Sequence, residues 1–243
     1  MAMKTKVFSA SLLLAGLAFA GTTEVTDEYV LGAMPLTISG SEVIINIPWV
    51  EAGSGGSTIA VSNLVKTTGL TAGDNLLWYN PSDSKYRIWE ATAHADVLYW
   101  DAVSSITEID ATKVASDSPA LGRGQALILK RASSESTTIY IVGQYTSASA
   151  TSTIYHGFNL LAPTATSGTT ELTTLFGTSN PVAGDQIITS EGVGYVWSSE
   201  HNKWGSWSYA DGWIFSEATN ITIPAGKGFW YNRKGDDSFS VTW

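Results

Sequence analysis

The chain contains no cysteine among its 243 residues. This absence excludes disulfide bonds, thiol catalysis and thiolate metal sites, and also the lipidated cysteine that tethers a bacterial lipoprotein. Stability must therefore come from the hydrophobic core. Ten tryptophans, ten tyrosines and seven phenylalanines supply large side chains for it.

Basic residues are also few, since 13 Lys and Arg stand against 22 Asp and Glu, for a net charge of −9. This acidic balance argues against a nucleic-acid partner, because nucleic-acid phosphates require a basic surface. It is compatible with solubility outside the cell or with a surface that binds cations.

The N-terminus has the three parts of a secretory signal peptide. Lys4 and Lys6 precede an apolar stretch at 7–19, and Ala18-Phe19-Ala20 forms a small-x-small cleavage site. The alternative, an uncleaved membrane anchor, would need an apolar run of ~20 residues, and this run is shorter. We expect residues 1–20 to be removed and the protein to be exported. Loss of the two lysines changes the net charge from −9 to −11.

Helical periodicity is scarce, and only 57–66 and 171–176 could each form a turn or two of helix. Short β-branched or aromatic segments bounded by Gly, Ser, Asp, Asn or Pro predict strands instead. The clearest of these are 41–49, 125–130, 137–142, 194–197 and 239–243. The Ser/Thr/Ala-rich stretch at 146–153 is typical of a surface loop.

The sequence also contains an internal repeat. An offset of 111 takes Tyr29-Val30-Leu31-Gly32 to Tyr140-Ile141-Val142-Gly143, and Ala72-Gly73-Asp74 to Ala183-Gly184-Asp185. Further along, an offset of 102 takes 124–131 to 226–233, and Thr137, Ile139 and Ile141 to Phe239, Val241 and Trp243. Several matches in order at two consistent offsets indicate a duplication.

These patterns predict an all-β protein of two antiparallel β-sandwich or barrel-like units in one pseudo-twofold body. The first unit spans 21–136 and the second 137–243. Segment 137–143 falls in both registers, so we expect its strand to be shared, ending the first unit and beginning the second.

Several motifs resemble a module of exported Gram-negative bacterial surface proteins. They are Gly-Phe-Asn-Leu-Leu at 157–161, Ala-Gly-Asp-Gln-Ile at 183–187, Tyr195 with Trp197, and the segment 223–230. The first half resembles the opening of a poorly characterised secreted family from the same kind of organism, although Leu121-Gly122-Arg123-Gly124-Gln125 stands where a proline is expected. The resemblance implies a location outside the cell or on its outer surface, and it carries over no catalytic residues.

Catalytic constellations are not evident. The only histidines are His94, His156 and His201, and there is no G-x-S-x-G motif. Two carboxylate pairs, Asp236-Asp237 and Glu108 with Asp110, could in principle hydrolyse glycosides. Asp236-Asp237 follows Lys234-Gly235, which favours a hairpin turn. We therefore expect a protein that is not an enzyme.

Asp74 and Asp185 recur in both units. Extracellular Asp-rich loops often bind calcium, so calcium is a possible ligand of these two residues. The alternative is structural, with Ala-Gly-Asp forming a tight turn and the carboxylate accepting hydrogen bonds from nearby backbone amides. No D-x-D-x-D-G run is present, which favours the turn.

Aromatic residues cluster in each unit, at Trp78–Trp100 in the first and Tyr195–Trp213 in the second. Aromatic faces stack on sugar rings, so an exposed subset could bind glycans, while the rest would form the core. The candidates for ligand binding are Trp197, Trp204, Trp207, Trp213, Trp89 and Trp100.

Three functional hypotheses follow. The protein could be a structural or interaction protein of the cell envelope, binding itself or envelope components; a carbohydrate-binding module; or a small outer-membrane β-barrel, because its last residues alternate and end in an aromatic residue. For the first, we predict self-association by strand addition at the two terminal strands. The assembly residues would be Tyr29, Phe239, Val241 and Trp243.

Overall fold

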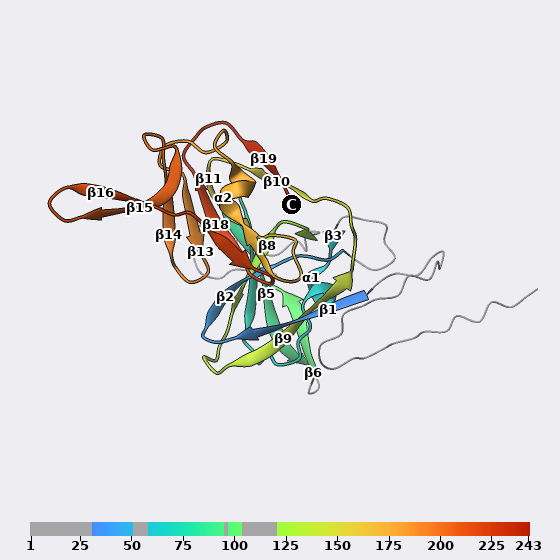
Figure 1. Ribbon diagram of the computed structural model, residues 1–243. Helices are drawn as coiled ribbons and strands as arrows, with labels where there is room; N and C mark the ends of the chain where they lie inside the picture. The colour runs from blue at the N-terminus through green and yellow to red at the C-terminus, as the bar shows by residue number, and fades with distance from the viewer. Residues whose placement is uncertain (1–30, 51–57, 95–96, 104–120) are drawn as a thin grey trace, which may run out of the picture.

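A computed structural model describes residues 31–50, 58–94, 97–103 and 121–243 (Figure 1). The described chain is all-β and its sheets are antiparallel, as predicted. Two short helices, α1 (Val61–Leu64) and α2 (Leu172–Phe176), interrupt the strands at the two places where helical turns were expected. Neither described helix has the length and apolar character needed to cross a membrane.

The first half of the chain forms a five-stranded sheet in the order β2-β8-β4-β5-β6. Two pairs, β1-β9 and β3-β7, complete this half. The strands are β1 (Leu31–Ile38), β2 (Glu42–Asn46), β3 (Thr58–Ile59), β4 (Asn75–Asn80), β5 (Lys85–His94), β6 (Val97–Ala102), β7 (Leu121–Gly122), β8 (Ala126–Lys130) and β9 (Thr137–Gln144).

The second half forms a six-stranded sheet in the order β11-β18-β13-β14-β15-β16, with the pairs β10-β19 and β12-β17. Its strands are β10 (Thr151–Ile154), β11 (Gly157–Leu161), β12 (Thr169–Glu171), β13 (Gln186–Thr189), β14 (Gly194–Ser198), β15 (Lys203–Tyr209), β16 (Trp213–Glu217), β17 (Thr222–Pro224), β18 (Phe229–Arg233) and β19 (Phe239–Thr242).

The described elements of the two halves follow one order. In each half the second strand pairs with the penultimate strand, which also pairs with the strand after the helix, and the first strand pairs with the last. Ala72-Gly73-Asp74 and Ala183-Gly184-Asp185 precede corresponding strands, β4 and β13. The β15-β16 hairpin extends the second sheet by one strand and projects from the body (Figure 1).

Segment 137–143 lies in β9, which pairs along its length with β1 of the first half. The second half begins with a strand of its own, β10, in the stretch expected to be a loop. Alternate residues of β10, Ser152 and Ile154, are buried, so its Ser/Thr composition reflects a half-exposed strand. We expected segment 137–143 to be shared by both units. In the described chain it pairs with β1, in the first half.

Within the match of 29–32 to 140–143, the two glycines share a role in the fold. Gly32 and Gly143 are opposite each other in the β1-β9 pair. A Cβ atom on Gly32 would lie 2.5 Å from the Trp49 ring, and one on Gly143 would collide with the Cβ atom of Trp49. Both glycines thus make room for one buried tryptophan.

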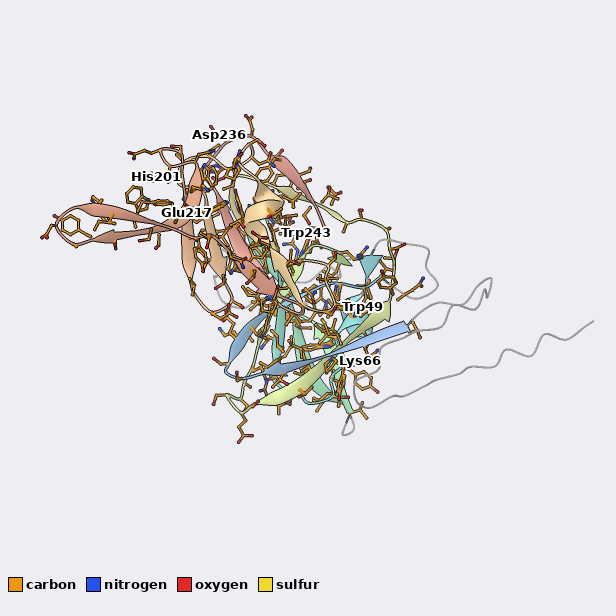
Figure 2. The ribbon with its side chains drawn as sticks, viewed as in Figure 1. Trp49, Lys66, His201, Glu217, Asp236 and Trp243 are labelled. Carbon is orange, nitrogen blue, oxygen red and sulfur yellow. The ribbon has the colours of Figure 1, made fainter. Side chains whose placement is uncertain are left out.

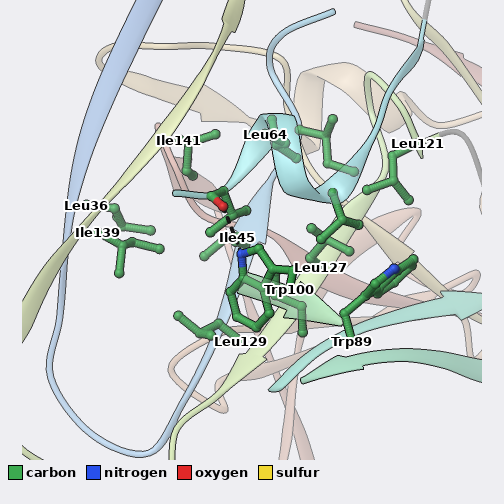
Figure 3. Packing of buried hydrophobic residues seen from close by; sticks show 14 of the residues in the cluster. Leu36, Ile45, Leu64, Trp89, Trp100, Leu121, Leu127, Leu129, Ile139 and Ile141 are labelled. Atoms are coloured by element: carbon green, nitrogen blue, oxygen red, sulfur yellow. Dashed lines mark hydrogen bonds between the residues drawn. The ribbon is translucent and has the colours of Figure 1, made fainter. Parts of the chain in front are cut away.

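Each sheet has a core on one face. In β8, Leu127 and Leu129 enter the first core, which β1, β9 and α1 cover, while Ala126 and Ile128 face the opposite way. Figure 3 shows this core around Trp89 and Trp100. In β18, Phe229 enters the second core.

The opposite faces of the two sheets pack against each other. This junction is made of apolar side chains from β2, β4, β8 and β11 and from the residue after β11. They are Ile44, Tyr79, Ala126, Ile128, Leu160 and Ala162, with Leu77, Tyr86 and Trp230 packed beside them.

Backbone contacts across the junction are reciprocal. The Asn46 N–H donates to the Gly226 carbonyl at 3.2 Å, and the Ala162 N–H donates to the Gly124 carbonyl at 3.1 Å. Asn46 and Ala162 occupy corresponding positions at the ends of β2 and β11, and both glycines precede corresponding strands with φ of +85°. The bridges Ile45–Lys227 and Leu161–Gln125 repeat this exchange. In each half, the end of the second strand thus contacts the residues that precede the penultimate strand of the other half.

Candidate functional site

Four of the six predicted ligand-binding tryptophans lie in the cores. Trp89 and Trp100 are 4% and 9% exposed in the first core, and Trp197 and Trp204 are 4% and 3% exposed in the second. The Trp100 indole N–H donates to the Val65 carbonyl at 2.8 Å. Because these rings lie on the core-facing sides of their sheets, a ligand cannot reach them without opening the core.

The other two tryptophans lie on the β15-β16 hairpin and are accessible. Trp207 is 39% exposed and Trp213 is 71% exposed. Trp207 pairs across the hairpin with Phe215, and Tyr209 pairs with Trp213. Since side chains alternate between the two faces of a strand, these four rings share one face. We call this set the aromatic face.

The rings of the aromatic face contact one another. Tyr209, itself 71% exposed, meets Trp213 at 5.4 Å between centroids, and Trp207 meets Phe215 at 5.1 Å. The His201 ring stacks on Phe215 at 4.5 Å and an interplanar angle of 20°. Cross-strand aromatic pairs of this kind stabilise a hairpin by roughly 0.2–1 kcal/mol each. The rings therefore hold one another in place while their outer surfaces stay exposed.

Polar groups border the aromatic face where the hairpin joins the sheet. Lys203 and Glu217 form an exposed ion pair of 2.9 Å, and Figure 2 shows Glu217 and His201 near this end. Gly205 lies opposite Glu217 in the β15-β16 pair. A Cβ atom at this position would lie 2.5 Å from the Phe215 ring, so the glycine permits the cross-strand packing.

The sequence candidates omitted Tyr209, Phe215 and His201, although a local signal was present. Trp207 and Tyr209 precede the turn residues Asp211-Gly212, and Trp213 and Phe215 follow them, all at spacings of two. This alternation around an Asp-Gly turn is typical of a hairpin with one aromatic face.

Asp74 and Asp185 are fully buried, and the two turns share the same contacts. Each carboxylate accepts a hydrogen bond from the backbone N–H three residues earlier and another from a residue after the penultimate strand, Ala132 or Lys234. Asp185 also receives the Arg233 guanidinium at 2.8 Å, and Arg131 lies 3.6 Å from Asp74. These are structural contacts that fix a turn.

Metal-ligating side chains do not gather in the part of the chain that the structure describes. No group of three or more His, Asp or Glu residues there is placed to hold an ion. Calcium requires several oxygen ligands, whereas the neighbours of the Asp185 carboxylate are N–H groups, one hydroxyl and a guanidinium. The geometry thus gives the calcium hypothesis no support.

The remaining catalytic candidates are scattered. His156 and His201 are exposed on different loops, and His94 ends β5. Asp236 is fully exposed in the connection between β18 and β19, which lie in different sheets, so this turn does not close a hairpin. Glu108 and Asp110 lie outside the described residues.

Of the predicted assembly residues at the C-terminus, Phe239 and Val241 lie in β19, which pairs with β10, and Trp243 follows this strand. Val241 is 3% exposed in the second core, Phe239 packs beside it, and the Trp243 indole donates to the Ser152 hydroxyl at 2.8 Å. Tyr29 lies outside the described residues. Pairing of β19 with another copy therefore stays a prediction, and it concerns only the edge that β10 leaves open.

A cavity of about 370 Å³ lies where the two halves meet, between the ends of β4 and β10. Arg123 borders it, and the Arg123 guanidinium donates to the carbonyls of Pro48 and Ala148. Burial lowers the pKa of Arg123. Because its hydrogen bonds join two loops, we interpret Arg123 as a structural bridge.

No protein-family model, curated protein or solved structure matches this chain. Its class is therefore defined by its own fold and site. It is an all-β protein of two face-packed antiparallel halves, one of which carries a projecting aromatic hairpin.

Proposed function

We propose that the protein is an exported interaction protein that binds sugar rings of envelope or extracellular glycans through the aromatic face of the β15-β16 hairpin. The observation that carries this proposal is the exposure of Trp207, Tyr209 and Trp213 on one side of a projecting element. Isolated exposed rings need no explanation, but a contiguous exposed apolar patch marks an interaction site.

Sugar rings fit the chemistry of this face. A pyranose ring presents C–H groups on its faces and hydroxyl groups at its rim, so it can pack on an indole or phenol while polar neighbours bind its rim. Tyr209 and Trp213 supply the apolar surface at the tip. Lys203, Glu217 and His201 supply donors and acceptors at the base. The predicted signal peptide supports an encounter with glycans outside the cytoplasm.

The position of the hairpin supports this proposal as well. The cores of both halves end before the tip, where Tyr209 and Trp213 contact each other and no core cluster. Substitution at the tip therefore changes binding without opening a core.

A glycan array with the mature protein tests the proposal, followed by titration of the best ligand. We expect Trp213→Ala and Tyr209→Ala each to weaken binding about tenfold or more, equivalent to ~1.4 kcal/mol. Ile214→Ala is the matched control, because Ile214 is 51% exposed on the opposite face of the same strand. Absence of glycan binding, or an equal loss in the control, contradicts the proposal.

A second proposal concerns the origin of the two halves. The common order of elements, the corresponding Asp turns and the reciprocal junction contacts support a duplication that produced a pseudo-twofold body. Only the second half then carries the aromatic hairpin among the described residues, so the duplication would have left one half as a scaffold.

A further inference from the structure

The outer edge of β16 is open in the part of the chain that the structure describes. β16 is the last strand of the six-stranded sheet, and β15 is the only described strand that pairs with it. Edges of this kind are normally blunted by Lys, Pro, a bulge or a covering element. The segment Trp213–Glu217 contains neither Lys nor Pro, and its residues are exposed except for the half-buried Phe215.

Hydrogen bonding to β15 shows which backbone groups face this edge. The Ala218 N–H donates to the Trp204 carbonyl at 2.9 Å, so Ala218 points toward β15. Backbone groups alternate in direction along an antiparallel strand, and Ser216 and Ile214 therefore also point toward β15. Trp213, Phe215 and Glu217 then direct their N–H and C=O groups outward.

We propose that this edge pairs antiparallel with β16 of a second copy, around a twofold axis at Phe215. In this register Phe215 is opposite its own copy and Trp213 is opposite Glu217 of the second copy. Both are positions at which outward-facing groups can exchange two backbone hydrogen bonds. An edge that matches itself in this way fits an isologous dimer, in which both copies use the same surface.

Charge favours this register over one with its axis at Ile214. With the axis at Phe215, Glu217 is opposite Trp213 of the second copy and keeps its 2.9 Å ion pair with Lys203. No like charges are therefore directly opposed. An axis at Ile214 would instead place Glu217 opposite Asp211 of the second copy, and directly opposed carboxylates destabilise strand pairing. Pairing at Phe215 also joins the two aromatic faces into one band. This pairing does not require the band to bind a glycan.

The experiment is sedimentation velocity of the mature protein over a range of concentrations, without glycan. Phe215→Pro removes the ring and the Phe215 N–H. It removes no hydrogen bond to β15, because this N–H points outward, and proline is tolerated on edge strands. Phe215→Ala removes the ring and keeps the N–H, and is the matched control. We expect wild type and Phe215→Ala to form dimers, and dimerisation of Phe215→Pro to be at least about tenfold weaker than that of Phe215→Ala. Thermal unfolding checks that both variants are folded.

Amide hydrogen exchange of the wild type locates the interface. We expect the amides of Trp213, Phe215 and Glu217 to gain protection as concentration rises. A protein that is monomeric at every concentration overturns the proposal, as does a dimer that Phe215→Pro leaves intact. Concentration-dependent protection at β19 and not at β16 also overturns it and assigns assembly to the C-terminal strand. None of these outcomes affects the glycan proposal, which is measured separately.

Discussion

The Asp185 carboxylate receives the Arg233 guanidinium at 2.8 Å where both side chains are almost completely buried. The same carboxylate accepts a 2.7 Å hydrogen bond from the Tyr231 hydroxyl and another from the Lys234 backbone N–H. Arg233 further donates to the carbonyls of Asn180 and Asp237. One buried acid thus joins the turn before β13 to the segment between β18 and β19.

Replacing Asp185 with Asn should destabilise the protein strongly. The substitution leaves the Arg233 charge buried without a counter-ion, and breaking a buried pair in this way costs about 3–5 kcal/mol. Urea unfolding measures the difference. Asp236→Asn, at a fully exposed position, is the control and should change the free energy of unfolding by less than about 0.5 kcal/mol. Equal effects of the two substitutions would contradict the role assigned to Asp185.

Tyr231 should make the protein sensitive to alkali. Burial and the hydrogen bond to Asp185 raise the pKa of Tyr231 above its ordinary value. Above pH ~10 the unfolded chain loses this proton while the folded chain keeps it, so stability falls as pH rises, by up to ~1.4 kcal/mol per pH unit. Tyr231→Phe should lower stability at neutral pH and flatten this alkaline slope. Parallel slopes for the two proteins would show that Tyr231 is not the cause.

Calcium should not stabilise the folded protein. The oxygens of Asp74 and Asp185 are directed at N–H donors, guanidinium groups or a hydroxyl, and a cation would have to displace them. We expect the Tm to be the same with added calcium and with a chelator. An increase in Tm with calcium that Asp185→Asn abolishes would restore the metal hypothesis.

Much of the fold was predictable because its signals are local. The strands at 125–130, 194–197 and 239–243 carry alternating or β-branched side chains, and the two Ala-Gly-Asp turns fix the start of β4 and β13. The match of Gly32 to Gly143 joins two cross-strand neighbours of Trp49, and such a long-range contact cannot be read from the sequence pattern. Thr37-Ile38 in β1 and Thr153-Ile154 in β10 are a further short match, between the first described strands of the two halves.

The site was less predictable, because residue type does not reveal which face of a sheet is covered. Trp204 and Trp207 lie three positions apart on β15, so they point to opposite faces. Long-range contacts show that Trp204 faces the core, where its ring is 6.3 Å from the ring of Phe176 in α2. Trp207 therefore faces away from the core. Its ring is exposed because the hairpin projects beyond the body.

Gly228 lies at the junction between the two halves. A Cβ atom at Gly228 would lie 2.6 Å from Cγ2 of Ile44, 2.8 Å from the Leu161 carbonyl oxygen and 2.9 Å from the Cβ atom of Ala126. Ala126 holds the corresponding position of the first half, immediately before the apolar run of β8. The junction thus accommodates one alanine and one glycine at this pair of positions.

Gly228→Ala should therefore destabilise the protein by about 1–3 kcal/mol through overpacking. Gly194→Ala is the control, because a Cβ atom there meets nothing within 4 Å, and it should leave stability unchanged or raise it by less than about 1 kcal/mol. Combining Gly228→Ala with Ala126→Gly exchanges the two residues between the halves and removes one of the three close contacts. In a double-mutant cycle this pair should recover part of the loss, since neighbouring substitutions are not additive. Strictly additive effects would show that the two positions do not meet across the junction, and the face-to-face packing of the halves would have to be revised.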